Sequence, residues 1–363
     1  MSKVGVALLG CGFISEIHSD CYQRFVREAK VEVVAGRDPA KTQAFAERFG
    51  IPRWFTNWRE AVQCDEVQLV DLCLPNFLHA EVTVAAAQAG KHVICEKPLC
   101  MNLQEADQMI AACQQAGVHL MYAEELCFTP KYVRAKQLVD EGALGKVYLV
   151  KQSEKHFGPH ADWFWDVARS GGGVMLDMGC HAFEFFRWVL GKPRAVSVMA
   201  QMGTYVHGDK TLGDDNSIGI VEFEGGAVGM AEESWAKRGG MDDRAEIYGA
   251  EGVVYADLLH GNALETFSER GYGYAVEKAP DTKGWTFTIY EEAWNYGFPQ
   301  ELAHFVGCVK HGTQPLETGE DGRAVLEIIM AAYESAATGR RVALPLQTQA
   351  KTPIEPWLKA RGR

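Results

Sequence analysis

The sequence has no long apolar run and no excess of basic residues. No stretch of the 363 residues approaches the roughly 18 consecutive apolar residues of a membrane-spanning helix, so we expect no membrane partner. The formal net charge is −12. A nucleic-acid-binding surface needs clustered positive charge, so we expect no nucleic-acid partner. Internal repeats are also missing, and 47% hydrophobic with 23% charged residues is typical of a soluble globular protein.

The ten cysteines form no CxxC pair and no cluster. This spacing argues against a disulfide framework and against a zinc knuckle. Scattered cysteines within apolar runs are typical of small core residues. We therefore expect a protein of a reducing compartment, the cytoplasm.

Short apolar runs alternate with helical segments over the first 125 residues. The runs cover residues 4–9, 31–35, 69–74, 91–95 and 118–123. Strands that alternate with helices of about 10–15 residues predict βαβ units on a parallel sheet. Because 363 residues exceed one typical core, we expect a second domain over residues 126–363.

The pattern after residue 125 predicts an antiparallel sheet. Strand-like segments occur at residues 147–153, 195–204, 217–223, 227–233 and 245–249, and Glu224-Gly225-Gly226 is a hairpin-type turn. We predict a single helix over residues 174–190 among these strands. Residues 341–363 contain three prolines, so we expect an extended tail there.

The turn after the first strand has the pattern Gly10-x-Gly12-x-x-Ser15. The first glycine permits a tight turn and the second lets the backbone approach a pyrophosphate. The following helix begins near Phe13 and Ile14, where free N–H groups can bind phosphate. We therefore predict a dinucleotide cofactor.

The end of the second strand distinguishes NAD from NADP. NAD enzymes usually place an acidic residue there to bind the ribose 2′-hydroxyl, but this chain has Gly36. Arg37 follows and can pair with a 2′-phosphate. Asp38 is a good helix cap, although it could instead shift to the ribose. The pattern slightly favours NADP, and NAD stays open.

Two segments carry candidate catalytic groups. Lys97 follows the strand at residues 91–95, where ligands bind in open α/β sheets, and Pro98 restricts its backbone. Asp177 and His181 are four residues apart in the predicted helix and would share one face. We interpret His181 as an acid/base group supported by the carboxylate. The alternative is a purely structural Asp–His contact.

Together these motifs resemble the Gfo/Idh/MocA oxidoreductases, the relatives of glucose–fructose oxidoreductase and inositol dehydrogenase. The resemblance spans nearly the whole chain. Its motifs are, in order, the glycine turn at Gly10, Pro75-Asn76 with His79, Glu96-Lys97-Pro98, and Gly171-Gly172-Gly173 leading to Asp177-x-x-x-His181.

The resemblance implies an N-terminal Rossmann domain and a C-terminal α/β domain with a large, mostly antiparallel sheet. The open face of that sheet would form a homodimer or homotetramer. Lys97 and His181 would act at the reacting carbinol of a sugar, glycoside or inositol, with Asp177 lining the site. The cofactor would lie near Pro75, Asn76, His79, Glu96 and Lys97.

Hydride transfer to NAD or NADP is thus the expected reaction. Two other functions would show the same sequence motifs as a dehydrogenase. One is a glycosidase that oxidises its substrate transiently with bound NAD, and the other is a regulator that binds the cofactor without catalysis.

Residues 154–165 combine aromatic and polar side chains that suit a sugar, which stacks on rings and hydrogen-bonds through its hydroxyls. The candidate substrate contacts are Lys155, His156, His160, Trp163 and Trp165. The alternative is a structural loop. Gly158-Pro159 interrupts the two histidines, so we expect no metal. Glu125 departs from the Glu-Asn pattern of the family, and if it lines the site it favours hydroxyl-rich or cationic substrates.

Overall fold

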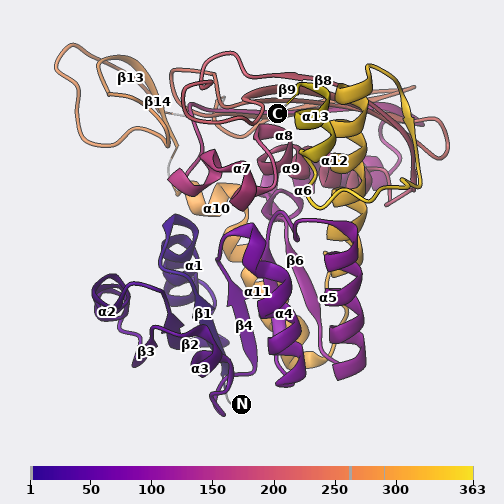
Figure 1. Ribbon diagram of the computed structural model, residues 1–363. Helices are drawn as coiled ribbons and strands as arrows, with labels where there is room; N and C mark the ends of the chain where they lie inside the picture. The colour runs from indigo at the N-terminus through magenta and orange to yellow at the C-terminus, as the bar shows by residue number, and fades with distance from the viewer. Residues whose placement is uncertain (1–2, 261–263, 290, 363) are drawn as a thin grey trace. The chain divides into compact units, whose positions relative to one another are not determined.

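The computed structural model describes residues 3–260, 264–289 and 291–362, and the chain divides into two compact units (Figure 1). Unit 1 contains the residues up to 125 and residues 297–326, and unit 2 contains the remainder. The predicted boundary at residue 125 agrees with this division. However, residues 297–326 were expected in the second domain. They belong to unit 1 because α11 (Phe298–His311) packs on α1 (Phe13–Arg24) and β1 (Val4–Leu9).

Unit 1 has a six-stranded parallel sheet in the order β3-β2-β1-β4-β5-β6, which confirms the Rossmann prediction. The strands are β1, β2 (Ala29–Ala35), β3 (Arg53–Phe55), β4 (Leu69–Leu72), β5 (His92–Glu96) and β6 (Leu120–Ala123). The helices between them are α1, α2 (Pro39–Arg48), α3 (Trp58–Val62), α4 (His79–Gln88) and α5 (Leu103–Ala116). The sequence reading missed β3 and α3, which are too short to show a period.

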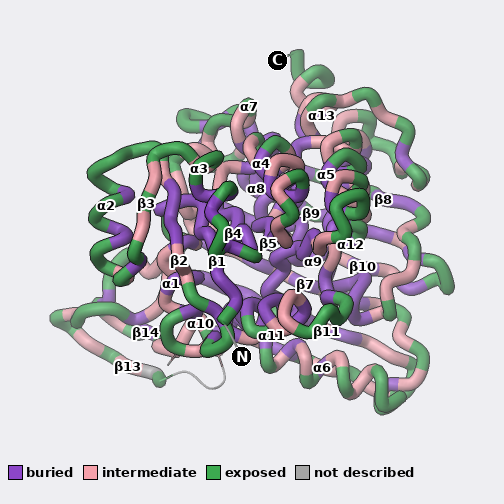
Figure 2. Tube along the Cα trace, turned by 90° about the horizontal axis from the view of Figure 1, so that it is seen from below, coloured by how far each residue is buried: buried purple, intermediate pink, exposed green. Residues whose placement is uncertain are grey.

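The strands of unit 1 form its core. Every residue of β1, β4 and β6 is buried, and Figure 2 shows β1 and β4 as buried segments among helices with exposed outer faces. Strands buried on both faces have continuous apolar sequences, which is why their positions were readable from the sequence.

Unit 2 has a seven-stranded sheet in the order β12-β11-β7-β10-β9-β8-β15. Only β7 and β10 pair in parallel, so the prediction of a mostly antiparallel sheet is confirmed. The strands are β7 (Val147–Lys155), β8 (Ala195–Gly203), β9 (Asn216–Phe223), β10 (Val228–Ser234), β11 (Asp242–Gly249), β12 (Val253–Asp257) and β15 (Val342–Ala343). A separate hairpin contains β13 (Leu264–Ser268) and β14 (Gly284–Thr288).

Helices cover one face of this sheet. The helices of unit 2 are α6 (Pro130–Asp140), α7 (Val167–Ser170), α8 (Val174–Asp177), α9 (Gly179–Val189), α10 (Glu292–Tyr296), the second half of α12 (Gly319–Thr338) and α13 (Glu355–Ala360). Helix α9 packs on β7 and β10, and α8 packs on β9.

Two predictions about unit 2 were wrong. The single helix expected over residues 174–190 is two helices, with Met178 between α8 and α9. The tail is not simply extended, because it contains β15 and α13. Pro356 lies in the first turn of α13, where its missing N–H has no intrahelical partner in any case.

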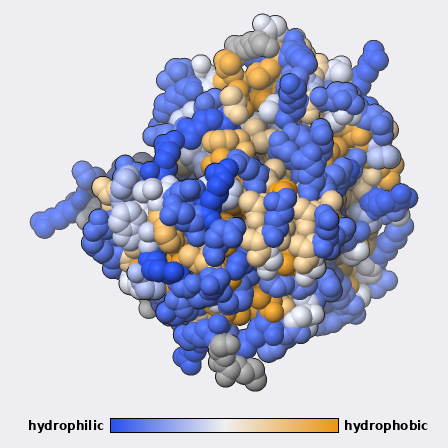
Figure 3. Space-filling view, turned by 60° about the horizontal axis from the view of Figure 1, so that its bottom comes forward, coloured by the Kyte–Doolittle hydropathy of each residue, from blue (hydrophilic) through white to orange (hydrophobic). Residues whose placement is uncertain are grey.

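No helix in the described part of the chain combines the length and the apolar character that a bilayer crossing requires. Hydrophilic side chains spread over most of the face shown in Figure 3, with apolar side chains between them.

Candidate active site

The glycine turn lies between β1 and α1, and Gly12 is the N-cap of α1. Gly10 has φ +121°, and a Cβ there would lie 2.1 Å from the carbonyl oxygen of Cys73, so only glycine fits. A Cβ on Gly12 would meet nothing within 4 Å, which leaves its backbone open to a ligand. Ser15 Oγ accepts the N–H of Gly12 at 3.3 Å. This turn fits a pyrophosphate at a helix N-terminus.

A side chain in place of Gly36 at the end of β2 would have to displace its neighbours. A Cβ on Gly36 would lie 2.5 Å from Thr42 Oγ1 and 2.7 Å from Cys11 Sγ. Asp38 is the N-cap of α2, because its Oδ1 accepts the N–H of Lys41 at 2.9 Å. Arg37 is exposed beside it.

His79 is a structural residue and not an open cofactor contact. Its imidazole is fully buried, with Nε2 2.8 Å from the carbonyl oxygen of Leu74 and Nδ1 3.1 Å from that of Pro98. Burial lowers the pKa of His79, so the ring is neutral. The imidazole thereby ties the end of β4 to the loop after Lys97.

The other predicted cofactor residues have mixed surroundings. Phe13 is exposed at the start of α1, whereas Ile14 packs against the apolar cluster between α1, β1 and α2, so its side chain serves the core. Pro75 and Asn76 follow β4, and Asn76 is buried at the start of a 3-10 turn (Asn76–Leu78).

Lys97 lies at the carboxyl edge of the parallel sheet, directly after Glu96 at the end of β5. The Lys97–Pro98 peptide bond is cis. The backbone N–H of Lys97 donates to Glu96 Oε2 at 3.1 Å. Glu96 therefore holds the backbone of the residue that follows it.

A buried ion cluster anchors Glu96. His18 on α1 has Nδ1 2.9 Å from Asp71 Oδ2 and Nε2 3.1 Å from Glu96 Oε1. Tyr22 donates its hydroxyl to Asp71 at 2.9 Å. Burial alone would lower the pKa of His18, but Asp71 and Cys73 raise it well above its ordinary value. The ring is thus an imidazolium between two carboxylates.

Sequence reasoning missed His18, because one histidine in a helix gives no signal of its partners on two strands. The ligand atoms of His18, Asp71 and Cys73 lie within 4.8 Å of one another. The direct contact between His18 and Asp71 accounts for this proximity without a metal.

Glu125 and Glu301 add carboxyl groups near this cluster. Glu301 on α11 is fully buried, and neither of its carboxyl oxygens has a hydrogen-bond partner among the described residues. Burial, together with the charges of Glu125 and Glu96, raises the pKa of Glu301 well above its ordinary value. Glu301 is therefore a neutral acid. Glu125 begins a 3-10 turn (Glu125–Phe128) and is also buried.

The triple glycine lets α8 begin against a buried acid. The N–H of Gly173 donates to the Tyr333 hydroxyl at 2.8 Å, and the N–H of Met175 donates to Asp214 Oδ2 at 2.8 Å. A Cβ on Gly173 would lie 2.1 Å from the carbonyl oxygen of Asp214. This close fit fixes α8 and hence Asp177 at its last position.

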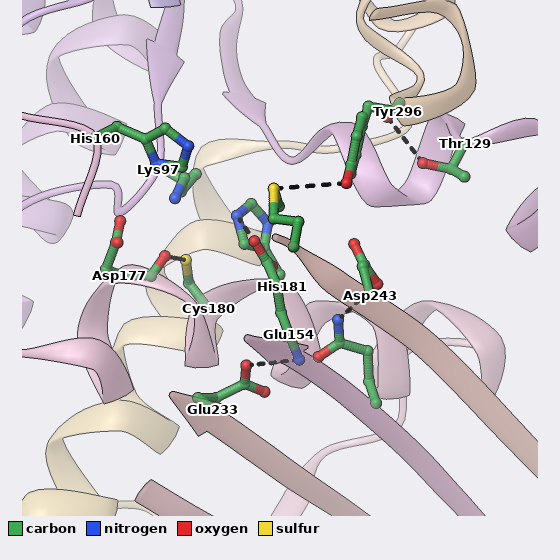
Figure 4. Close-up of polar contacts among 12 residues, drawn as sticks. Lys97, Thr129, Glu154, His160, Asp177, Cys180, His181, Glu233, Asp243 and Tyr296 are labelled. Carbon is green, nitrogen blue, oxygen red and sulfur yellow. Dashed lines mark hydrogen bonds and ion pairs between the residues drawn. The ribbon is translucent and has the colours of Figure 1, made fainter. Parts of the chain in front are cut away.

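Asp177 and His181 do not lie on one continuous helix, so that prediction was wrong. Asp177 ends α8, and its Oδ2 accepts the indole N–H of Trp235 at 3.2 Å. His181 lies in the first turn of α9, with Nε2 4.0 Å from Glu154 Oε2 on β7 (Figure 4). The sequence does not single out Glu154, although Glu154 lies on the same buried face of β7 as Val150.

Lys155, a predicted substrate contact, is the last residue of β7. Lys155 lies on the opposite face of β7 from Glu154, because adjacent strand residues alternate. Its ammonium group pairs with Glu232 on β10 at 2.6 Å.

His156 is buried, and its Nδ1 has no hydrogen-bond partner among the described residues. Its ring stands edge-on to His160 at 4.8 Å between centroids, and His160 pairs with Glu277. Burial and the nearby charge of His160 lower the pKa of His156 well below its ordinary value. His156 is therefore a neutral group that can accept or donate a hydrogen bond.

The two tryptophans predicted to contact substrate, Trp163 and Trp165, differ in their packing. Trp165 packs on the buried Trp235, 5.5 Å between ring centroids, and on His207 at 4.9 Å, so it is a structural residue. Trp163 stacks on Phe164 at 3.9 Å and is half-buried, which leaves part of its ring surface accessible.

Comparisons with known proteins agree with this geometry. Residues 4–124 match the oxidoreductase family with an NAD-binding Rossmann fold, and residues 132–255 match the GFO/IDH/MocA C-terminal domain. Myo-inositol 2-dehydrogenase of Thermotoga maritima is 27% identical over 343 residues, 93% of this chain and 98% of that protein. D-xylose 1-dehydrogenase (NADP(+)) 2 of Haloferax volcanii is 31% identical, over 87% of this chain and 93% of its own.

A solved structure is similar over almost the full length. GenD2 from gentamicin A biosynthesis, in complex with NAD, has a TM-score of 0.90 and 33% identity, and the match covers 95% of this chain and 97% of GenD2. The chain therefore belongs to the GFO/IDH/MocA family of oxidoreductases, with an NAD-binding Rossmann domain at its N-terminus.

Proposed function

We propose that this chain is an NAD(P)-dependent dehydrogenase that transfers hydride between a nicotinamide cofactor and a secondary alcohol of a sugar, glycoside or inositol. The observation that carries this proposal is the open backbone at Gly12, at the start of α1 on a sheet of Rossmann order. The names of the relatives support the substrate class, because they include dehydrogenases of inositol, levoglucosan and D-xylose.

The chain supplies a base and a cation for this chemistry. The nicotinamide, when bound, supplies the hydride acceptor in the oxidation direction. His181 takes the hydroxyl proton, since an imidazole titrates near neutrality. Lys97 stabilises the negative charge that develops on the substrate oxygen. The roles of Lys97 and His181 can be exchanged without a change in the overall reaction.

We retain His156, His160, Trp163, Asp177 and Glu125 as candidate substrate contacts. His156 offers a buried ring nitrogen without a partner among the described residues, and Trp163 offers a ring face for stacking. Lys155 and Trp165 are left out because the first lies on the other face of β7 and the second packs in the core.

The choice of cofactor depends on Arg37. The cap formed by Asp38 and the absence of a carboxylate at Gly36 favour NADP, whereas the NAD complex of GenD2 favours NAD. We expect Arg37→Ala to raise KM for NADP⁺ by about tenfold or more, because a lost charge-assisted hydrogen bond costs about 1.5–3 kcal/mol. KM for NAD⁺ should stay within about twofold. Steady-state kinetics with both cofactors measure this, and an equal change for the two would exclude a 2′-phosphate contact.

We also propose a homodimer or homotetramer formed through the open face of the unit 2 sheet. This face carries exposed apolar side chains that are unusual on a monomer surface. They include Tyr148, Met199, Ile218, Ile220 and Tyr255. Light scattering after gel filtration gives the mass directly. The ten buried free thiols support a reducing compartment, and we propose the cytoplasm.

The function is tested with the purified protein. Any bound nucleotide is released and identified by mass, and reduction of NAD⁺ and NADP⁺ is then followed with inositols, levoglucosan, D-xylose, D-apiose and gentamicin A. We expect a nicotinamide nucleotide and turnover of at least one of these compounds. Failure to bind either nucleotide would overturn the proposal. Cleavage of an aryl glycoside with no net cofactor reduction would instead identify the transient-oxidation glycosidase.

A further inference from the structure

Three acidic side chains form a row across neighbouring strands of unit 2. In the sheet register, Asp243 on β11 lies opposite Glu154 on β7, and Glu154 lies beside Glu233 on β10. Residues paired across strands point to the same face, about 5 Å apart at Cβ. All three are buried on the face that α9 covers. We call this set, Asp243, Glu154 and Glu233, the acidic row (Figure 4).

Two members of the acidic row, Asp243 and Glu233, have few hydrogen-bond donors among the described residues. Asp243 Oδ1 accepts from the Tyr132 hydroxyl at 2.6 Å and from Gln152 Nε2 at 3.3 Å. Glu233 Oε2 accepts the backbone N–H of Glu154 at 3.1 Å. The second oxygens of these two residues, Asp243 Oδ2 and Glu233 Oε1, are buried with no hydrogen-bond partner among the described residues. It is costly to bury three charged carboxylates on neighbouring strands of one sheet face, so such a site favours protonated carboxyl groups.

The row therefore holds protons at neutral pH. Burial raises the pKa of Glu233 well above its ordinary value, and burial also raises the pKa of Asp243, to about 7. The other ionisable groups that face the row are His181 from α9, Tyr132 from α6 and Tyr296 from α10. Four further charged groups lie near the ends of the row. Lys155 and Glu232 are on the other face of the sheet, and the other two are Asp242 and Asp257.

His181 connects the row to the proposed chemistry. Its Nε2 lies 4.0 Å from Glu154 Oε2, the central member of the row. Catalytic hydrogen bonds are often long without substrate and shorten in the complex. Asp177, the partner that sequence spacing suggested, accepts the indole N–H of Trp235 with its Oδ2.

We propose that Glu154 is the positioning residue that acts through His181, and that the acidic row takes up the proton released by alcohol oxidation. The hydroxyl proton leaves the substrate oxygen and binds Nδ1 of His181. The Nε2–H bond then breaks as an O–H bond forms on Glu154, which returns a neutral imidazole. Asp243 and Glu233 flank Glu154 on the neighbouring strands, and no redox change accompanies the transfer. This inference rests on the proposed function.

Glu154→Gln tests the proposal because it keeps the size of the side chain and removes the acceptor. We expect kcat for oxidation to fall about 10- to 100-fold, within the range of a lost proton-transfer group. The acid limb of the pH–rate profile should move to lower pH, since the carboxylate no longer favours the imidazolium. Glu154→Asp should restore part of the rate and the original profile. If Glu154 had only a structural role, Glu154→Gln would lower the stability and leave the pH–rate profile unchanged.

Glu246→Gln is the matched control. It makes the same substitution on β11, but Glu246 lies on the opposite face from Asp243 and pairs with Lys151 at 3.1 Å. Its kcat and profile should match the wild type. A Glu154→Gln enzyme that melts normally and keeps kcat within about twofold, or keeps the wild-type profile, would overturn the proposal.

A second readout does not depend on turnover. Infrared difference spectra at pH 7 should show a protonated carboxyl band in the wild type that is lost in Glu233→Gln. The absence of this band would show that Glu233 is ionised and would overturn the protonated acidic row. If the band is present but the wild-type protein oxidises no alcohol, the proposed function fails, and with it the link between the row and catalysis.

Discussion

Lys97→Ala is expected to lower turnover by at least about 100-fold while the nicotinamide cofactor still binds. A positioned proton-transfer or charge-stabilising group contributes on this scale. The backbone of residue 97 should stay in place, because its N–H donates to Glu96 and the substitution keeps that bond. Stopped-flow kinetics measure turnover, and fluorescence titration measures cofactor binding.

The control for Lys97 lies at the other end of the same strand. Lys91 precedes β5, and its ammonium group donates to the carbonyl oxygens of Cys64 and Val67 at 3.0 and 2.8 Å. Lys91→Ala should lower the melting temperature somewhat and leave turnover per folded molecule within about twofold. Near-normal turnover in Lys97→Ala would remove Lys97 from the proposed chemistry.

His18→Gln is expected to destabilise the protein by about 3–5 kcal/mol, the scale of removing one partner from a buried ion pair. The substitution would leave the carboxylates of Asp71 and Glu96 buried without their shared cation. Because Glu96 also accepts the N–H of Lys97, the proposed catalytic turnover should fall as well. Chemical denaturation gives the free energy of unfolding.

The difference in stability between the wild type and His18→Gln should depend on pH, in a direction set by the pKa of His18. Burial alone would lower the pKa of His18. However, Asp71 and Cys73 hold this pKa well above its ordinary value in the folded protein. The contribution of His18 to stability is therefore complete below the unfolded pKa of about 6.5 and is lost as pH rises through the folded pKa. The difference between wild type and His18→Gln should shrink at alkaline pH.

His311→Gln, at an exposed position of the same unit, should change the free energy of unfolding by no more than about 0.5 kcal/mol. A cost for His18→Gln that is equally small, or that grows with pH, would contradict the imidazolium assignment.

The sequence predicted most strands of unit 1 because they are buried on both faces and read as apolar runs. It missed β3, since three residues show no period, and it missed the break at Met178 because the mostly apolar helical segments on either side read as one helix. The placement of residues 297–326 in unit 1 was unreadable for another reason. The packing of α11 on α1 joins segments almost 300 residues apart.

The sequence by itself determined the glycine turn, the lysine after β5 and the family to which they belong, because these features depend on backbone geometry within a few residues. Only the tertiary structure decided which charges meet. His18 joins Asp71 to Glu96 across one helix and two strands, and Glu154 meets His181 across a sheet and a helix. Which charges pair depends on strand register and on the packing of distant segments. Local sequence spacing predicts neither of these.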